Sequence, residues 1–321
     1  MKSWQASAPS NIALIKYMGK VDSTQNLPTN SSISLTLNKL LTYVHITEDD
    51  KDQWLPLQKE NTFKIELSEK GEKRFLSNWL RLKQYFQIEG NYLIQSASNF
   101  PADCGIASSA SSFAALTMAA FNVAQDKGSQ NLDINKVKLA ELSREASGSS
   151  CRSFFEPFCV WSDSISKFYS AYENLFHFVV IVNGEKKKVS SSDAHKLVVT
   201  SDLFKGRPER ANHRLELVKN LLNEKSLSSW EKLYEVCWQE FWDMHALFET
   251  SQPPFGYLTT GSIEVLNLTR NLWQTFKDGP IVTMDAGPNI HFIWRQDQHS
   301  IALAFKAELE KSNYKVIVGN E

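Results

Sequence analysis

The chain has too few cysteines for a disulfide-rich secreted domain, and their spacing matches no zinc site. The four are Cys104, Cys151, Cys159 and Cys237, and none forms a CxxC pair. In a chain of 321 residues, so few cysteines favour reduced thiols and a cytoplasmic location.

The sequence also lacks an excess of charge of either sign and any long apolar run. Lys and Arg total 35 against 36 Asp and Glu, so the formal net charge is −1. This balance gives no general attraction for nucleic acid or for an anionic membrane. No apolar stretch approaches the ~20 residues of a membrane-spanning helix, and residues 1–20 have no unbroken apolar core of a secretion signal. We expect a cytoplasmic protein with no membrane or nucleic-acid partner.

Two common nucleotide-binding motifs are missing as well. No GxxxxGK[ST] occurs, which excludes a Walker-type phosphate loop. No GxGxxG occurs either, so a dinucleotide-binding fold is unsupported.

What is present is material for a large core, with 42% hydrophobic and 22% charged residues. Apolar patterning predicts strands in the first part at 11–18, 31–37, 40–47, 62–68 and 92–98, with helices over 72–86, 106–122 and 134–147. The second part follows a strand at 175–183 and a polar linker at 184–196, and contains helices at 210–224, 229–249 and 261–277 and a strand–turn–strand at 280–294. We predict an α+β fold of two lobes, residues 1–184 and 185–321.

One segment places several hydroxyls directly before a strong helix former. It reads PADCGIASSAS, residues 101–111, and an Ala-rich run follows it. Serines at a helix start can simply cap the unpaired backbone N–H groups. The same N–H groups and the positive end of the helix dipole can also cradle a phosphate. Both interpretations stay open on these residues alone.

Two basic segments could bind an anion. Lys16 and Lys20 lie four residues apart in NIALIKYMGK, and they could converge on one anion if the chain turns at Gly19. They could equally be solvated lysines at a strand end. Arg152 lies in SGSSCRS, where its forked donors suit phosphate or carboxylate. That segment could also be an ordinary helix end followed by a turn.

A carboxylate in MDAGPN completes a set suited to phosphoryl transfer. Asp285 follows an apolar strand and precedes a Gly-Pro turn, where an Asp usually serves the turn itself. Phosphoryl transfer needs charge neutralisation and a carboxylate that orients the attacking hydroxyl. The histidines, among them His195, His213 and His245, are interpreted as surface or packing residues.

In this order, the segments resemble the GHMP kinase superfamily. PADCGIASSAS is similar to its second motif, Pro-xxx-Gly-Leu-x-Ser-Ser-Ala, with Ile106 in place of Leu. Within the superfamily the chain resembles the diphosphomevalonate decarboxylase family. The blocks that carry this resemblance are NIALIKYMGK, LPTNSSISLTL, NFPADCGIASSAS, SGSSCRS, KKKVSSSDAHK and MDAGPN. They extend from near the N-terminus to the last predicted strands.

The resemblance implies a two-lobed GHMP kinase fold with a deep ATP and substrate cleft between the lobes. It also implies ATP- and Mg²⁺-dependent decarboxylation of mevalonate 5-diphosphate, through phosphorylation of its 3-hydroxyl. The products would be isopentenyl diphosphate, ADP, phosphate and CO₂, in the mevalonate pathway of isoprenoid biosynthesis. The family resemblance further implies a homodimer.

Residue roles follow from the same resemblance. Asp285 and Lys16 would be catalytic. The substrate would be held by Tyr17, Lys20, Ser147, Ser149, Arg152 and Ser191. ATP would be held by Gly105, Ala107, Ser108, Ser109, Ala110 and Ser111, and Ser109 would also contact Mg²⁺.

The chain departs from the family pattern at a few positions. Met18 replaces the usual Trp of KYWGK, and Glu156 and Pro157 stand where the family usually has two glycines. Asp103 and Cys104 occupy loop positions that are commonly small and uncharged, and SSSDAHK differs from the commoner SSTxGM. The charged residues assigned above are retained. Two alternatives stay open: a sister enzyme, either a mevalonate 3-kinase or a phosphomevalonate decarboxylase, and a nucleotide-binding protein that has lost catalysis.

Overall fold

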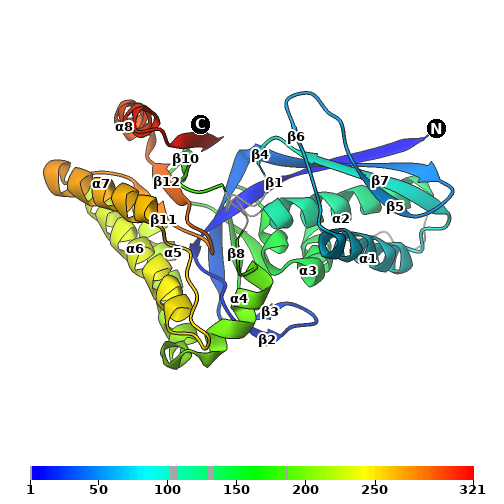
Figure 1. The fold of residues 1–321 in the computed structure, drawn as a ribbon, viewed down its shortest axis with the longest axis horizontal. Helices are drawn as coiled ribbons and strands as arrows, with labels where there is room; N and C mark the ends of the chain where they lie inside the picture. Colours follow the sequence, from blue (N-terminus) through cyan, green and yellow to red (C-terminus); the bar gives the residue numbers. More distant parts are fainter. Residues whose placement is uncertain (1, 102–107, 129–133, 185–186) are drawn as a thin grey trace.

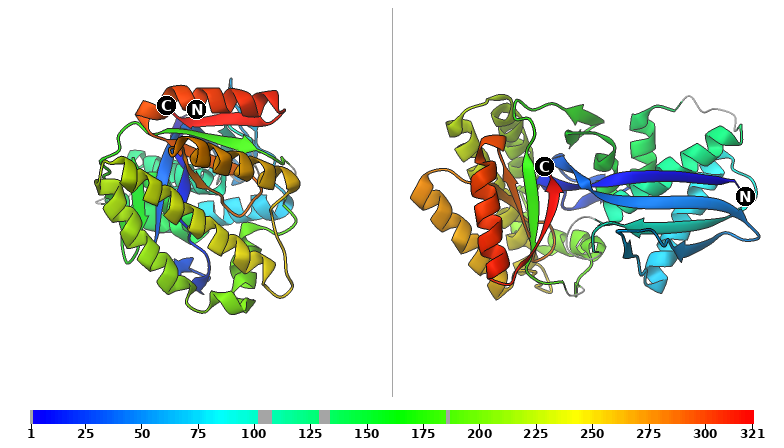
Figure 2. Two further views of the ribbon diagram at one scale, coloured as in Figure 1. Left: turned by 90° about the vertical axis from the view of Figure 1, so that its left-hand side faces the viewer. Right: turned by 90° about the horizontal axis from the view of Figure 1, so that it is seen from above.

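One long antiparallel strand pair runs through the molecule and connects its two lobes (Figures 1 and 2). The computed structural model describes residues 2–101, 108–128, 134–184 and 187–321. β1 (Ser3–Ile15) pairs with β4 (Ser32–Asp49) over almost its whole length. We expected two strands in place of β4. They form one strand because a register shift between Pro9 and Ser10 leaves residues 38–40 as a bulge opposite β1.

The first lobe is built on a seven-stranded sheet that shares β4 as its central strand. One edge of β4 pairs with β1, and the other pairs with β7 (Asn91–Ser98) and β8 (Phe158–Trp161). The outer strands are β5 (Gln53–Pro56), β6 (Phe63–Lys64) and β9 (Ile165–Phe168). The strand predicted at 62–68 is therefore mostly absent, since only its first residues pair with β7.

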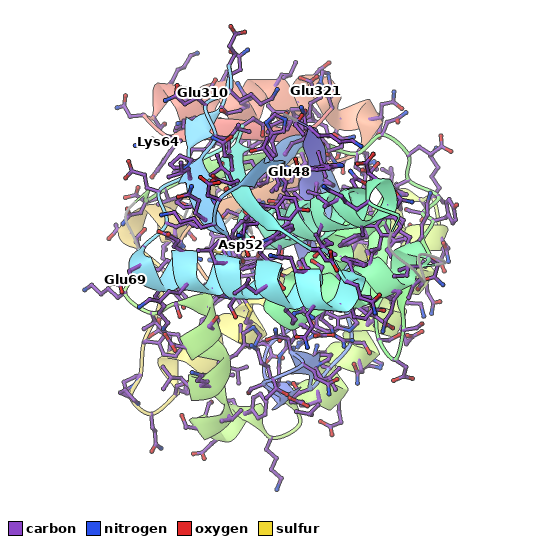
Figure 3. The ribbon with its side chains drawn as sticks, turned by 90° about the vertical axis from the view of Figure 1, so that its right-hand side faces the viewer. Glu48, Asp52, Lys64, Glu69, Glu310 and Glu321 are labelled. Atoms are coloured by element: carbon purple, nitrogen blue, oxygen red, sulfur yellow. The ribbon has the colours of Figure 1, made fainter. Side chains whose placement is uncertain are left out.

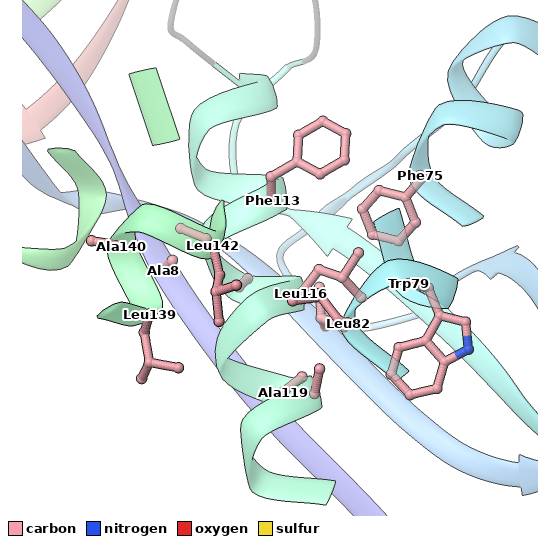
Figure 4. Packing of buried hydrophobic residues seen from close by; sticks show 14 of the residues in the cluster. Ala8, Phe75, Trp79, Leu82, Phe113, Leu116, Ala119, Leu139, Ala140 and Leu142 are labelled. Atoms are coloured by element: carbon pink, nitrogen blue, oxygen red, sulfur yellow. The ribbon is translucent and has the colours of Figure 1, made fainter. Parts of the chain in front are cut away.

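Three helices cover this sheet and bury the core of the lobe. They are α1 (Glu69–Phe86), α2 (Ser108–Asp126) and α3 (Lys136–Ala146). Figure 4 shows Phe75 and Trp79 of α1 facing Phe113 and Leu116 of α2. The buried face of α2 is rich in alanine, which lets the helix lie close to the sheet.

The outer surface of this lobe is charged, as Figure 3 shows with Glu69 at one end of α1 and Asp52 beside the helix. Asp52 links the sheet side to α1, because its carboxylate accepts hydrogen bonds from Trp79 Nε1 at 2.8 Å and Lys83 Nζ at 2.7 Å.

The second lobe has a four-stranded antiparallel sheet in the order β11–β12–β10–β13. The strands are β10 (Phe176–Ile181), β11 (Ile281–Thr283), β12 (Ile290–Trp294) and β13 (Lys315–Asn320). The helices are α5 (Arg207–Asn223), α6 (Leu227–Glu249), α7 (Thr260–Phe276) and α8 (His299–Lys311). The predicted two-lobed α+β fold is confirmed.

The lobes share a core where β1 and β4 reach the second lobe. Ile12 and Leu35 belong to the same buried cluster as Leu215 of α5 and Trp230 of α6. Asn320 of β13 adds polar contacts, since its Nδ2 donates to the Thr36 carbonyl at 2.8 Å. The end of β1 is therefore fixed against both lobes. The lobe boundary predicted after residue 184 stays a prediction. β10 comes before that residue in the sequence but pairs with β12 and β13 in the sheet of the second lobe.

Short elements complete the junction between the lobes. They are β2 (Lys20–Asp22), β3 (Leu27–Pro28), the 3₁₀ helices η1 (Gly148–Phe154), η2 (Val198–Thr200), η3 (Asp202–Phe204) and η4 (Gln296–Gln298), and α4 (Ser191–Leu197). The segment predicted as a polar linker thus contains most of α4. Ser190 caps this helix, and its Oγ accepts the Asp193 N–H at 3.2 Å.

The described residues include three of the four cysteines and the helices that were expected not to span a membrane. Cys151, Cys159 and Cys237 are buried free thiols, and Cys104 lies outside the part of the chain that is described. None of the helices in that part combines the length and the apolar character needed to cross a membrane.

Candidate active site

A cavity of about 330 Å³ lies where the end of β1, the start of α2, η1, α4 and the loop after β11 meet. Many residues that the sequence singled out line it together. They are Lys16, Tyr17, Lys20, Ser108, Ser109, Ser147, Ser149, Arg152, Ser191 and Asp285. Residues from both lobes contribute, so this is a cleft between the lobes.

Lys16 and Asp285 form an ion pair in this cavity although 269 positions separate them in the sequence. Lys16 follows β1 and Asp285 follows β11, and Lys16 Nζ lies 2.7 Å from Asp285 Oδ1. The Lys16 side chain is only 2% exposed, whereas the Asp285 side chain is 27% exposed. The pair therefore combines a buried ammonium with a carboxylate that is open to the cavity.

The pKa values of the pair follow from burial and mutual attraction. Burial lowers the pKa of Lys16, and the charge of Asp285 only partly offsets this effect. Burial is the largest single effect on Asp285 and on its own would raise the pKa, but the charge and hydrogen bond of Lys16 together with the charges of His291 and Arg152 outweigh it. The net pKa of Asp285 lies below its ordinary value, so its carboxylate is ionised at neutral pH.

The backbone of Lys16 is held by a buried network of charges. Its N–H donates to Glu240 Oε1 at 2.9 Å, and its carbonyl accepts from Asn30 Nδ2 at 2.9 Å. Glu240, on α6, also accepts hydrogen bonds from Arg207 and Arg214 of α5, each at 2.9 Å for Oε2. Glu240 and Arg207 are both fully buried. The second lobe thus fixes the position of a lysine that belongs to the first.

The turn after β1 carries Lys20 into the same cavity. Lys20 Nζ donates to Asn26 Oδ1 at 2.6 Å. Burial lowers the pKa of Lys20, and the nearby charges of Arg74 and Lys196 lower it further. The two lysines therefore converge on one cavity, as one of the two sequence interpretations required.

Arg152 is buried at the cavity wall, with 4% of its surface exposed. Its Nη1 donates to Ser32 Oγ at 3.0 Å and its Nε to Asn11 Oδ1 at 3.3 Å. Among the described residues it forms no ion pair. A buried guanidinium that has neutral partners and lines a cavity is suited to receive an anionic ligand.

Tyr17 packs between η1 and α4. Its ring lies 4.8 Å from that of Trp161 and 4.3 Å from that of His195. A Cβ at Gly148 would lie 2.6 Å from the Tyr17 ring, so only glycine fits there. The sequence predicted a binding role for the serines on either side of Gly148, but no pattern in it marks this steric requirement.

The serine-rich segment enters the cavity at the start of α2. Ser109 is exposed, and its Oγ lies 3.4 Å from Ser147 Oγ. Ala110 and Ser111 are buried and do not line the cavity, and Ser111 Oγ lies 2.7 Å from Thr42 Oγ1. Gly105 and Ala107, assigned to ATP from the resemblance, lie outside the described residues.

Three further cavity residues were missed or dismissed from the sequence. Arg74 of α1 and Lys187 add positive charge to the lining, and His195 adds an imidazole. No motif marks Arg74, which is one of several charged residues on its helix. His195 was interpreted as a surface or packing residue because the histidines do not cluster in the sequence. His245 does pack beneath the site, where its Nε2 donates to the Asp285 carbonyl at 3.1 Å.

Two family models cover most of the chain. Residues 8–171 match the diphosphomevalonate decarboxylase-like N-terminal domain. Residues 177–316 match the mevalonate 5-diphosphate decarboxylase C-terminal domain.

Individual relatives agree with the family models. Diphosphomevalonate decarboxylase of Debaryomyces hansenii is 31% identical and aligns with 93% of this chain and 81% of its own length. A crystal structure of a mevalonate diphosphate decarboxylase from Legionella pneumophila is 44% identical, with a TM-score of 0.90 over 98% of this chain and 100% of that one. A structure described as MDDEF in complex with MVAPP, AMPPCP and magnesium is 28% identical, with a TM-score of 0.85 over 99% and 97%. The chain belongs to the mevalonate 5-diphosphate decarboxylase family.

Proposed function

We propose that the protein catalyses the ATP-dependent decarboxylation of mevalonate 5-diphosphate to isopentenyl diphosphate, with ADP, phosphate and CO₂ as the other products. The observation that carries this proposal is the Lys16–Asp285 pair at 2.7 Å, in a cavity that also contains Lys20 and Arg152. One carboxylate and several cations in a cleft match the needs of phosphoryl transfer to a hydroxyl of an anionic substrate.

The related structure that contains MVAPP, AMPPCP and magnesium supports ATP and Mg²⁺ as the co-substrate and the ion of this chain. Its fold matches over nearly the whole chain, which supports placing both ligands in the cavity described above.

Asp285 would orient the 3-hydroxyl of the substrate and accept its proton. Its carboxylate is ionised and open to the cavity, and its Oδ1 is fixed by Lys16. A lowered pKa makes Asp285 a weak base. This fits a loose transition state, in which little negative charge gathers on the attacking oxygen before phosphorus is transferred. Its main contribution is therefore position, and the hydroxyl oxygen forms the bond to the γ-phosphorus as the bond to ADP breaks.

The second half of the reaction needs little from the protein. The phosphorylated tertiary oxygen leaves as phosphate with its bonding electrons. The carbon–carbon bond to the carboxylate then breaks, its electrons form the double bond, and CO₂ is released. Lys16, which is paired with Asp285 at the cavity, would stabilise the departing phosphate.

The substrate diphosphate would lie against the cations on the η1 side of the cavity. Lys20 and Arg152 provide the charge, and charge-assisted hydrogen bonds to phosphate are the strong ones. Further donors come from the hydroxyls of Tyr17, Ser147, Ser149 and Ser191. Arg74 and Lys187 extend this positive surface.

ATP would place its phosphates at the start of α2, near Ser108 and Ser109. The described residues contain no group of three His, Cys, Asp or Glu that could hold a metal by itself. The Ser109 hydroxyl at the start of α2 fits a Mg²⁺ ion that would take most of its ligands from ATP and water and one from the protein. When bound, such an ion neutralises charge on the β- and γ-phosphates.

The assembly and location are proposed on the family resemblance. We infer a cytoplasmic homodimer, and the buried free thiols at positions 151, 159 and 237 are consistent with a reducing compartment.

The decisive experiment compares three substrates. Purified protein with Mg²⁺-ATP is given mevalonate, its 5-phosphate or its 5-diphosphate, and ADP and CO₂ are followed separately. We expect both products only with the 5-diphosphate. ADP without CO₂ from mevalonate would indicate a 3-kinase, and turnover of the monophosphate would indicate the other sister enzyme. Binding of ATP with no product from any of the three would indicate a catalytically inactive protein.

A further inference from the structure

His195 lies on α4 with one ring nitrogen already occupied. Its Nδ1 accepts a hydrogen bond from the Gly19 N–H at 3.0 Å. Only glycine fits at position 19, because its φ is +93° and a Cβ there would lie 2.7 Å from Phe204. The ring also packs against Tyr17, at a centroid distance of 4.3 Å. The orientation of the imidazole is therefore determined by its surroundings.

The contact with Gly19 also determines the tautomer. A backbone N–H can only donate, so Nδ1 must carry the lone pair and the proton of the neutral ring must lie on Nε2. No described residue accepts a hydrogen bond from Nε2, and this nitrogen is not among the fully buried polar atoms that lack a partner. His195 lines the active-site cavity. Nε2–H is thus an accessible donor at that cavity.

The charges around the ring keep it neutral. Burial lowers the pKa of His195 to about 3, and Lys20 and Arg152 contribute to the shift. A second proton would also have to occupy Nδ1, which would break the bond to Gly19. Lys20 on β2 and Arg152 on η1 face the ring from the substrate side, and Asp193 and Lys196 belong to its own helix.

We propose that His195 is a substrate-binding residue, which donates a hydrogen bond from Nε2 to the diphosphate of the substrate alongside Lys20 and Arg152. This inference rests on the function proposed above. The diphosphate is favoured over the phosphates of ATP because the ring contacts Tyr17 and Gly19, which belong to the same segment as Lys20. A neutral donor adds a directed hydrogen bond without adding another charge to a crowded set of cations.

Two amide substitutions separate the two ring nitrogens. In His195→Asn the side-chain oxygen can replace Nδ1 and accept from Gly19, but no donor reaches the position of Nε2. In His195→Gln the amide nitrogen can replace Nε2 as a donor, while the bond to Gly19 is lost. His213→Asn, on an exposed position of α5, serves as the control. The dissociation constant of mevalonate 5-diphosphate is measured by calorimetry without ATP, and KM values for both substrates are measured in steady state.

We expect His195→Asn to weaken binding of mevalonate 5-diphosphate about tenfold, equivalent to about 1.4 kcal/mol, with the KM for ATP unchanged. His195→Gln should stay within about threefold of the wild-type protein. The proposal is overturned if His195→Asn binds normally, if both variants are weakened equally, or if the KM for ATP rises instead. Failure of the proposed function is distinguishable, because then the wild-type protein would release no CO₂.

A measurement on the unaltered protein provides a second test that does not depend on the folding of a variant. In protein labelled with ¹⁵N-histidine, mevalonate 5-diphosphate should shift the Nε2 resonance of His195 and slow exchange of its proton, while Nδ1 stays unprotonated. No change at Nε2 on saturation with this substrate would contradict the assignment.

Discussion

Replacing Asp285 by Asn tests the chemical centre of the site with a minimal change in shape. The substitution removes the charge that lies 2.7 Å from Lys16 Nζ. An Asp that only formed the turn before Gly287 could be replaced without loss, because Asn serves as well in turns. The structure argues against that role, since the turn is closed by a backbone bond from Gly287 N–H to the Asp285 carbonyl at 2.7 Å.

The magnitude has a catalytic part and a structural part. Loss of the group that orients the hydroxyl and accepts its proton should lower kcat about 10²-fold or more. The variant also leaves Lys16 buried without its partner. Removing one member of a fully buried pair costs about 3–5 kcal/mol. Because Asp285 is 27% exposed, we expect a smaller loss in the free energy of unfolding, of about 1–3 kcal/mol.

The assay follows ADP and CO₂ from mevalonate 5-diphosphate and measures urea unfolding of the same preparations. The double variant with Lys16→Met removes both charges and serves as the matched control for stability. It should recover much of the lost unfolding free energy while remaining inactive, because both catalytic groups are gone. A folded Asp285→Asn protein with a kcat within about threefold of wild type would refute the catalytic assignment.

The pH dependence of the wild-type protein offers a second check on the same pair. The pKa of Asp285 is lowered, so its carboxylate stays ionised until the pH falls below the ordinary value of 3.8. Burial lowers the pKa of Lys16. As the pH rises, Lys16 therefore loses its charge before the pH reaches the ordinary lysine value of 10.5. We expect the acidic limb of kcat/KM that belongs to Asp285 to lie below pH 3.8 and to disappear in Asp285→Asn. An acidic limb near pH 6 that vanished in this variant would contradict the shift.

Three further predictions concern the neighbours of this pair. Arg152→Ala should raise the KM for mevalonate 5-diphosphate by a factor that corresponds to about 1.5–3 kcal/mol and leave the KM for ATP unchanged in steady-state kinetics. A raised KM for ATP with an unchanged KM for mevalonate 5-diphosphate would contradict the substrate-binding role of Arg152. Ser109→Phe should abolish ATP binding in a nucleotide titration while the fold remains intact, and normal ATP affinity would reduce the segment to a helix cap. Glu240→Ala should lower the free energy of unfolding in urea by about 3 kcal/mol, at the lower end of the range because Asp243 still contacts Arg207 at 3.2 Å. Glu231→Ala on an exposed position of the same helix should change it by less than about 0.5 kcal/mol, and equal effects of the two substitutions would contradict the role of the buried network.

The sequence predicted the elements that have strong apolar periodicity. α6 and α7 were predicted within about two residues of their observed bounds, because each has a buried face and capping residues that mark its start. β4 was predicted as two strands because residues 38 and 39 are polar, and only the pairing with β1 shows that a bulge carries them. α4 was missed because its seven residues are too few for a helical pattern to emerge from a polar segment.

In the site as well, local sequence context identified candidate residues but not their contacts with residues that are distant in the sequence. The segments that bear Lys16, Arg152 and Asp285 could be selected from residue type and local context. Their convergence could be inferred only from the resemblance, because no local rule brings positions 16 and 285 to 2.7 Å. Glu240 had no signal at all, since a glutamate on an amphipathic helix is usually solvated, and here it is fully buried against Arg207. His195 could not be selected from the sequence, because its contact with Gly19 joins segments 176 positions apart.

The most direct test of the proposed function is the stoichiometry of the reaction. Wild-type protein is incubated with Mg²⁺-ATP and mevalonate 5-diphosphate labelled at its carboxyl carbon, and ADP and labelled CO₂ are counted in the same reaction. We expect one CO₂ for each ADP, with neither product formed when ATP or the diphosphate is left out. ADP formed without CO₂, or CO₂ released without ATP, would contradict the proposed function.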